Sequence, residues 1–190
     1  MAVNKDDFYY EYLKSRSSLG DFYRKYFLYP KLKKYLSGKV LDIGCGIGDY
    51  LRFDKNALGV DINPNTVKYC KDLGLDARLM DPNILPFENE TYESVMLDNV
   101  MEHIIEPTDL LKEVHRVLKV NGNVVIGVPG EKGYAHDPDH KVFYDSEKLE
   151  LLLAKHNFKT ASIFYMPLRS NFLNKKIRQY CLYMHFTKLP

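Results

Sequence analysis

The fold is decided by Val40-Leu41-Asp42-Ile43-Gly44-Cys45-Gly46-Ile47-Gly48, a short apolar run that ends in alternating glycines. The apolar residues predict a buried strand, and the glycines predict a tight turn where bare backbone lets a ligand approach closely. The glycine spacing is G-x-G-x-G. A dinucleotide fingerprint, G-x-G-x-x-G, would need its third glycine at position 49, which is Asp49.

Strand and helix patterns alternate on the C-terminal side of this turn. A helix is expected to open at Asn63-Pro64 and to stop near Gly74, another to end at Asn121-Gly122, and a third to begin at Asp145 or Ser146. This order predicts an α/β fold with a doubly wound, mostly parallel, Rossmann-like sheet of seven strands. The expected strands are 39–43, 57–61, 76–80, 94–97, 123–128, 158–166 and 180–186.

The segment before the glycine turn is helical and aromatic in pattern. We interpret residues 1–190 as one domain, with a helical cover over 1–37 and a cofactor-binding core over 38–190. Gly20-Asp21 is expected to separate two helices, and Pro30 to bend or restart the second. The aromatic side chains either pack these helices onto the sheet or fold over a ligand as a lid.

Composition limits the classes of partner. A formal net charge of +2 over 190 residues is too small to predict nucleic-acid binding. Three widely spaced cysteines indicate reduced thiols, and no stretch has the length and apolar character of a membrane span, so a cytoplasmic location is expected. The basic, aromatic segment around Lys175-Lys176-Ile177-Arg178 leaves open a peripheral contact with a membrane surface.

A carboxylate follows the second strand. Asp61 lies at the end of Ala57-Leu58-Gly59-Val60-Asp61, where its oxygens can accept hydrogen bonds from both hydroxyls of a ribose. In parallel sheets ligands bind beyond the carboxyl ends of the strands, so Asp61 is expected beside the glycine turn.

These motifs and their order resemble the class I S-adenosylmethionine-dependent methyltransferases, in particular members that act on small molecules. The glycine turn with Asp61 resembles the family's first motif and its acidic successor. Asp81, followed by Leu85-Pro86-Phe87 and Tyr92-Glu93-Ser94-Val95, is similar to the stretch before the fourth strand. Asp98-Asn99-Val100-Met101-Glu102-His103-Ile104 resembles the segment after it, and the resemblance spans residues 38–165.

The resemblance implies S-adenosylmethionine as cofactor and assigns residues to its parts. Gly44, Cys45, Gly46 and Asp42 would surround the methionine portion, which Leu97 and Asp98 would border. The ribose hydroxyls would bind Asp61, and the adenine would contact the remaining residues, Ile62, Met80 and Asp81.

Three histidines lie where the acceptor of the methyl group is expected. His103 follows the fourth strand and is the candidate general base, and a structural role for it stays open. His136 and His140, in Ala135-His136-Asp137-Pro138-Asp139-His140, are candidate acceptor-binding residues, and a structural role for His140 also stays open. We interpret this loop as polar rather than metal-binding.

The expected function is therefore methyl transfer to a small-molecule or saccharide-like acceptor, because so short a chain offers no separate domain for a larger one. Two alternatives stay open. One is an NAD-binding oxidoreductase, which the glycine spacing disfavours. The other is a non-catalytic protein that binds the cofactor and acts through a partner. The oligomeric state is not predicted.

Overall fold

The computed structural model describes residues 5–15 and 17–190; positions 1–4 and 16 of the expected helical cover lie outside the described residues. Its centre is a seven-stranded sheet in the order β3-β2-β1-β4-β5-β7-β6. The strands are β1 Val40–Ile43, β2 Ala57–Asp61, β3 Ala77–Leu79, β4 Tyr92–Asp98, β5 Leu118–Pro129, β6 Phe158–Met166 and β7 Cys181–Lys188. Strands β1 to β5 pair in parallel, and β7 is antiparallel to both of its neighbours. The predicted seven-stranded, mostly parallel sheet is confirmed.

Side chains alternate between the two faces of the sheet, as the pleat of a strand requires. In β4, Val95 and Leu97 join one core cluster together with the helices α6 (Thr108–Val117) and α8 (Ser146–Ala154), whereas Met96 joins the other. That second cluster includes side chains of α3 (Tyr29–Leu32) and α5 (Pro64–Asp72). Because helices cover both faces, the central strands are buried throughout.

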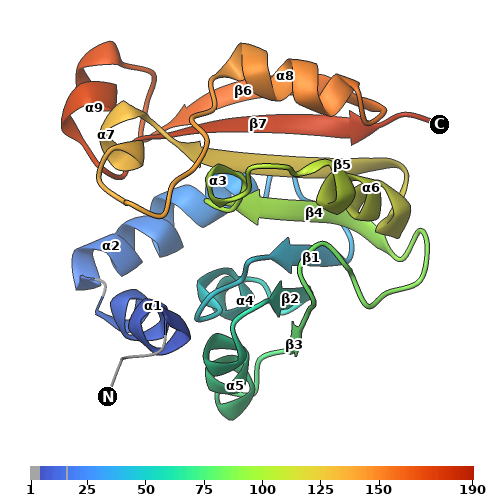
Figure 1. Ribbon diagram of the computed structural model, residues 1–190, viewed down its shortest axis with the longest axis horizontal. Coiled ribbons are helices and arrows are strands. Elements are labelled where there is room, and N and C mark those ends of the chain that lie inside the picture. Colours follow the sequence, from blue (N-terminus) through green and yellow to red (C-terminus); the bar gives the residue numbers. More distant parts are fainter. Residues whose placement is uncertain (1–4, 16) are drawn as a thin grey trace.

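The remaining helices gather at one end of the sheet. Figure 1 shows α1 (Lys5–Lys14), α2 (Ser18–Tyr23), α7 (Glu131–Tyr134) and α9 (Asn171–Lys176) at the end toward which the arrows of β1 and β4 point. The short elements η1, α4 and η2 cover Arg24–Leu28, Asp49–Phe53 and Met101–His103. Strand order reverses between β1 and β4, so the loops after these two strands flank the crevice in which doubly wound sheets bind ligands.

Two expected helix boundaries were wrong. The break expected at Gly20-Asp21 lies earlier, because Ser17 caps α2 by accepting a hydrogen bond from the Gly20 backbone N–H, and the helix continues through both residues. The helix expected to end at Asn121-Gly122 ends at Val117, and β5 starts at the next residue. The caps at Asn63 and Asp145 are confirmed.

Within residues 5–15 and 17–190, none of the helices combines the length and the apolar character that crossing a lipid bilayer would require.

Candidate active site

The glycine turn adopts backbone angles that favour glycine and is held by hydrogen bonds to β2. Gly44 has a φ of 73° and Gly46 a φ of 52°, values that side chains disfavour, and a Cβ on Gly44 would lie 2.5 Å from Val100 Cγ2. The backbone N–H groups of Gly44 and Cys45 both donate to the carbonyl oxygen of Val60, at 2.8 and 3.1 Å. The turn is therefore fixed against the end of β2 with its backbone bare.

The Asp61 side chain links the glycine turn to the residues that begin α5. One carboxylate oxygen accepts a hydrogen bond from the backbone N–H of Gly46, and the other accepts one from Asn63, both at 2.8 Å. The side chain is buried. Asp61 thus sets the position of the glycine turn relative to the start of α5.

A cavity of about 460 Å³ opens beside the turn. Eight of the predicted site residues line it: Asp42, Gly44, Cys45, Gly46, Asp98, His103, His136 and His140. The structure therefore brings the expected methionine-binding residues and the expected acceptor-binding histidines into one space of the size that small ligands occupy.

The other predicted site residues do not line this cavity. Ile62 and Asp81 are exposed, Met80 is buried, and Leu97 lies in the hydrophobic core. These residues, with Asp61, stay predictions as cofactor contacts. Leu13 of α1 packs at the turn, where a Cβ on Gly46 would lie 3.1 Å from its Cδ1.

Carboxylates dominate one wall of the cavity. Burial raises the pKa of Asp42 well above its usual range, and the neighbouring charges of Asp98, Asp61 and Asp49 raise it further. Asp98 accepts a hydrogen bond of 2.8 Å from the Tyr183 hydroxyl, and Asp49 forms an ion pair of 3.3 Å with Arg24. Such a group of acids favours a ligand that carries positive charge next to the turn and disfavours a pyrophosphate.

S-adenosylmethionine fits this wall, because it carries a positive sulfonium and a positive ammonium group on its methionine portion. Gly44 and Gly46 line the cavity together with Asp42 and Asp98. The residues that line the cavity thus match the charge of the methionine portion.

His103 and His140 both line the cavity, and their ring centroids are 4.8 Å apart. Burial lowers the pKa of His103 and the nearby His140 lowers it further, so His103 is neutral at neutral pH. Its Nδ1 is 3.3 Å from the carbonyl oxygen of Asp139, which can only accept, so Nδ1 carries the proton and Nε2 keeps its lone pair.

Sequence reasoning missed several residues of the cavity wall, contributed mostly by the ends of the chain: Tyr12, Leu13, Ser17, Tyr23, Arg24, Asn99, Arg178, Cys181 and Tyr183. The aromatic N-terminal segment contained the signal for some of them, since a lid was one of its two interpretations. Arg178, in the basic tail considered for membrane contact, lies at the cavity with its guanidinium 3.4 Å from the Tyr12 hydroxyl.

Glu102 is a buried carboxyl group beside the two histidines. It is 1% exposed, and neither of its carboxylate oxygens has a hydrogen-bond partner among the described residues. Burial raises the pKa of Glu102 to about 8, with further contributions from Asp98 and Asp137. Its neutral form is therefore favoured in the folded protein.

Replacing Glu102 with glutamine is expected to raise the free energy of unfolding near pH 8 and to have little effect on it near pH 4.5. The folded-state pKa lies above the unfolded-state value, so the folded protein holds a proton that the unfolded chain has lost, and stability falls as pH rises between these two values. Thermal unfolding of the original protein and of Glu102→Gln, monitored by calorimetry across this pH range, measures the difference in stability. An equal effect at both ends of the range would contradict it.

Comparisons with known proteins identify the family of the domain and its fold. Residues 41–126 match a family model described as a methyltransferase domain. The ubiquinone/menaquinone biosynthesis C-methyltransferase UbiE of Desulfotalea psychrophila is 30% identical over 99 residues, which are 47% of this chain and 40% of that protein. A tRNA (carboxymethyluridine(34)-5-O)-methyltransferase of Arabidopsis thaliana is 32% identical over 110 residues, which are 53% of this chain and 27% of that protein.

The chain spans about half, or less, of the length of the curated relatives it matches. Among solved structures, a Thermotoga maritima protein described as an S-adenosylmethionine-dependent methyltransferase, possible histamine N-methyltransferase, superposes with a TM-score of 0.77 at 18% identity. The superposition covers 96% of this chain and 97% of that one, so the fold is shared over nearly the whole length.

The family expected from the motifs is therefore confirmed by the matching domain model and by the sheet that carries it. The chain contains a methyltransferase domain over residues 41–126, and its fold is that of the class I S-adenosylmethionine-dependent methyltransferases.

Proposed function

We propose that the chain transfers the methyl group of S-adenosylmethionine to a small-molecule or saccharide-like acceptor bound in the cavity beside the glycine turn. One observation carries the proposal: a single cavity of about 460 Å³ is lined both by the glycine turn with Asp42 and Asp98 and by His103, His136 and His140. A cofactor site and an acceptor site thus share one space.

The cofactor, when bound, supplies a methyl group made electrophilic by the sulfonium. The chain has to orient the acceptor and exclude water. Asp42 and Asp98 would hold the positively charged methionine portion, and the Tyr183 hydroxyl fixes the carboxylate of Asp98. The Nε2 lone pair of His103 lies at the acceptor side, where it can take a proton from an acceptor hydroxyl or amine.

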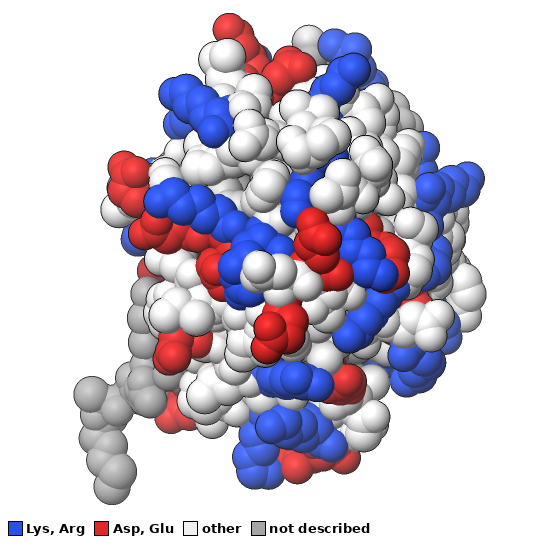
Figure 2. All heavy atoms as spheres, turned by 90° about the vertical axis from the view of Figure 1, so that its right-hand side faces the viewer, with Lys and Arg blue, Asp and Glu red and all other residues white. Residues whose placement is uncertain are grey.

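The N-terminal helices support a small acceptor rather than a large one. Side chains from Tyr12 to Tyr29 form part of the cavity wall, so the acceptor has to enter between these helices and the loops after the strands. A macromolecule would need an extended, charged face. Such a face would have to lie at the carboxyl ends of the parallel strands, around the cavity; Figure 2 shows the opposite face, which carries both basic and acidic side chains.

The names of the relatives point to different acceptors: one names ubiquinone/menaquinone biosynthesis, and another names tRNA. The acceptor class therefore needs a direct test. Incubation with methyl-labelled S-adenosylmethionine, once with a metabolite extract and once with total tRNA, separates these classes. Label in the metabolite fraction supports the proposal; label in tRNA alone contradicts it. Binding without any transfer supports the non-catalytic alternative.

The cofactor assignment has its own test. S-adenosylhomocysteine is expected to bind in calorimetric titration, and NADH is expected not to bind, because Asp49 and Asp42 line the cavity where a pyrophosphate would approach. Binding of NADH without binding of S-adenosylhomocysteine would establish the oxidoreductase alternative instead.

The free thiols of Cys45, Cys70 and Cys181 support a cytoplasmic location for this reaction.

A further inference from the structure

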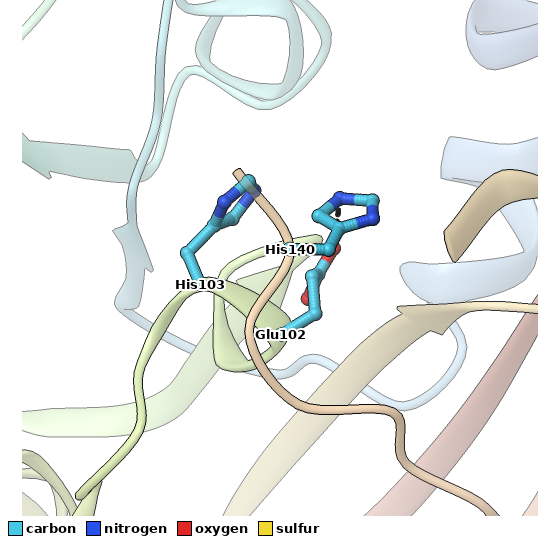
Figure 3. Close-up of side chains that lie close together, drawn as sticks. All are labelled: Glu102, His103 and His140. Carbon is cyan, nitrogen blue, oxygen red and sulfur yellow. Dashed lines mark ion pairs between the residues drawn. The ribbon is translucent and has the colours of Figure 1, made fainter. Parts of the chain in front are cut away.

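Three potential metal ligands meet beside the acceptor end of the cavity. Glu102 and His103 come from η2, directly after β4, and His140 comes from the loop after α7 (Figure 3). A potential ligand atom from each of the three residues lies within 4.8 Å of the corresponding atoms of the other two residues. The loop is held in place because the backbone carbonyl oxygen of Glu102 accepts hydrogen bonds from the N–H groups of Lys141 and Val142, at 2.7 and 3.0 Å.

Both imidazole rings are oriented as metal ligands are. His103 Nδ1 lies 3.3 Å from the carbonyl oxygen of Asp139, and His140 Nδ1 lies 3.0 Å from that of Tyr134. A carbonyl oxygen can only accept, so each Nδ1 carries the proton and each Nε2 has a lone pair to donate. Histidines that bind metals typically have the second nitrogen held by a backbone or carboxylate oxygen in this way.

Glu102 brings a buried carboxyl group that the described residues leave without a hydrogen bond. Both carboxylate oxygens are buried without a hydrogen-bond partner among the described residues, and Oε1 lies 3.8 Å from Nε2 of His140. Buried polar groups in folded proteins are normally satisfied, so an unsatisfied carboxyl group aimed at a histidine requires an explanation. A divalent cation between the two would supply the missing partner.

A fourth ligand is close. Asp137 Oδ2 lies 4.0 Å from His140 Nε2, and Asp137 also lines the cavity. Ligands on a tetrahedral ion with bonds of about 2.1 Å are ~3.4 Å apart, so Glu102 Oε1 and Asp137 Oδ2, at 3.8 and 4.0 Å from His140 Nε2, lie within ~1 Å of the spacing that a shared metal needs.

We propose that Glu102, His103 and His140, with Asp137 as the fourth ligand, bind a divalent transition-metal ion at the acceptor end of the cavity. Two imidazoles and two carboxylates suit zinc, manganese or iron(II) better than magnesium or calcium, which prefer oxygen ligands alone. This site replaces the metal-free interpretation of the loop in the sequence. The ion would bind an oxygen or nitrogen of the acceptor and orient it toward the methyl group; this role rests on the proposed function, whereas the site itself rests on the geometry.

Cobalt(II) is the probe that tests the site, because its visible absorption reports coordination by protein ligands without any assay of turnover. The full chain, freed of metal by dialysis against chelator, is titrated with CoCl₂ and then with ZnCl₂. We expect one Co²⁺ per chain with a visible absorption band that Zn²⁺ abolishes. Glu102→Gln and His140→Ala are expected to weaken binding at least tenfold.

His136→Ala is the matched control, since His136 lies in the same loop and lines the same cavity but is outside the ligand cluster. It is expected to keep the cobalt spectrum. The isosteric Glu102→Gln variant guards against unfolding, and its circular dichroism should match that of the original protein. Absence of a band in the original chain, or binding by Glu102→Gln as tight as by the original chain, overturns the proposal.

A parallel titration with S-adenosylhomocysteine distinguishes failure of the metal site from failure of the proposed function. Tight binding of this nucleoside with no cobalt spectrum defeats the metal site alone. A cobalt spectrum without nucleoside binding supports the site and defeats the proposed function.

Discussion

Replacing Asp61 with alanine is expected to weaken binding of S-adenosylhomocysteine about 5- to 150-fold, equivalent to ~1–3 kcal/mol. The carboxylate accepts hydrogen bonds from the buried backbone N–H groups of Gly46 and Asn63, so alanine leaves both donors without their partner and frees the glycine turn. The expected ribose contact is lost in the same step. Isothermal titration calorimetry with the nucleoside measures the change.

Two further variants locate the cause of that loss. Asp61→Asn keeps one acceptor oxygen and turns the other into a donor, so an intermediate affinity is expected. Asp72→Ala removes an exposed carboxylate of α5 that pairs with exposed Lys68, and should leave the affinity unchanged. An Asp61→Ala protein that folds and binds as tightly as the original would remove Asp61 from the cofactor site.

The sequence predicted the sheet well because local patterns determine it. Buried parallel strands read as continuous apolar runs, and a helix cap such as Asn63 followed by Pro64 marks a start without reference to the rest of the molecule. The helix that ends at Val117 was predicted to run longer, because Leu118-Lys119-Val120 fits either a last helical turn or the start of β5. Pairing of Tyr92 with Leu118 along the sheet decided for the strand.

The cavity was predicted only in part, for a different reason. Residues such as Asp42 and His103 lie at strand ends, so topology alone places them at one edge of the sheet. Arg24 and Tyr183 reach the same space through the packing of helices and the placement of β7, which no local pattern encodes. The sequence showed Glu102 only as part of a motif. Its burial without a hydrogen-bond partner among the described residues could not be predicted, because it depends on the loop at Lys141 and Val142 that packs against it.

The N-terminal segment shows how two interpretations can hold together. Tyr29 packs against Tyr50 and Phe53 in the core, whereas Tyr12 and Arg24 line the cavity. The same helices thus pack onto the sheet with one set of side chains and wall the cavity with another. Packing and cover were not exclusive alternatives.

Replacing His103 with alanine is expected to slow methyl transfer about 10²-fold or more while leaving the affinity for S-adenosylhomocysteine unchanged. The ring is held by the carbonyl oxygen of Asp139 and lines the cavity, but it is not among the residues expected to hold the nucleoside. Label transfer from S-adenosylmethionine at saturating cofactor gives the rate, and calorimetry gives the affinity. His156→Ala, at the end of α8, is the control and should keep the full rate.

The pH profile of the original chain adds a second readout. Burial and His140 lower the pKa of His103, so its neutral, lone-pair form persists below the usual histidine range, and the rate should fall only when the pH drops further. Both a general base and a metal ligand need that lone pair. Added metal distinguishes the two roles. If His103 is one metal ligand among four, excess Zn²⁺ restores part of the activity of His103→Ala. If His103 itself accepts the proton, Zn²⁺ restores none. Near-normal turnover of His103→Ala without added metal would assign the histidine a purely structural role, holding the loop that carries Asp139 and His140.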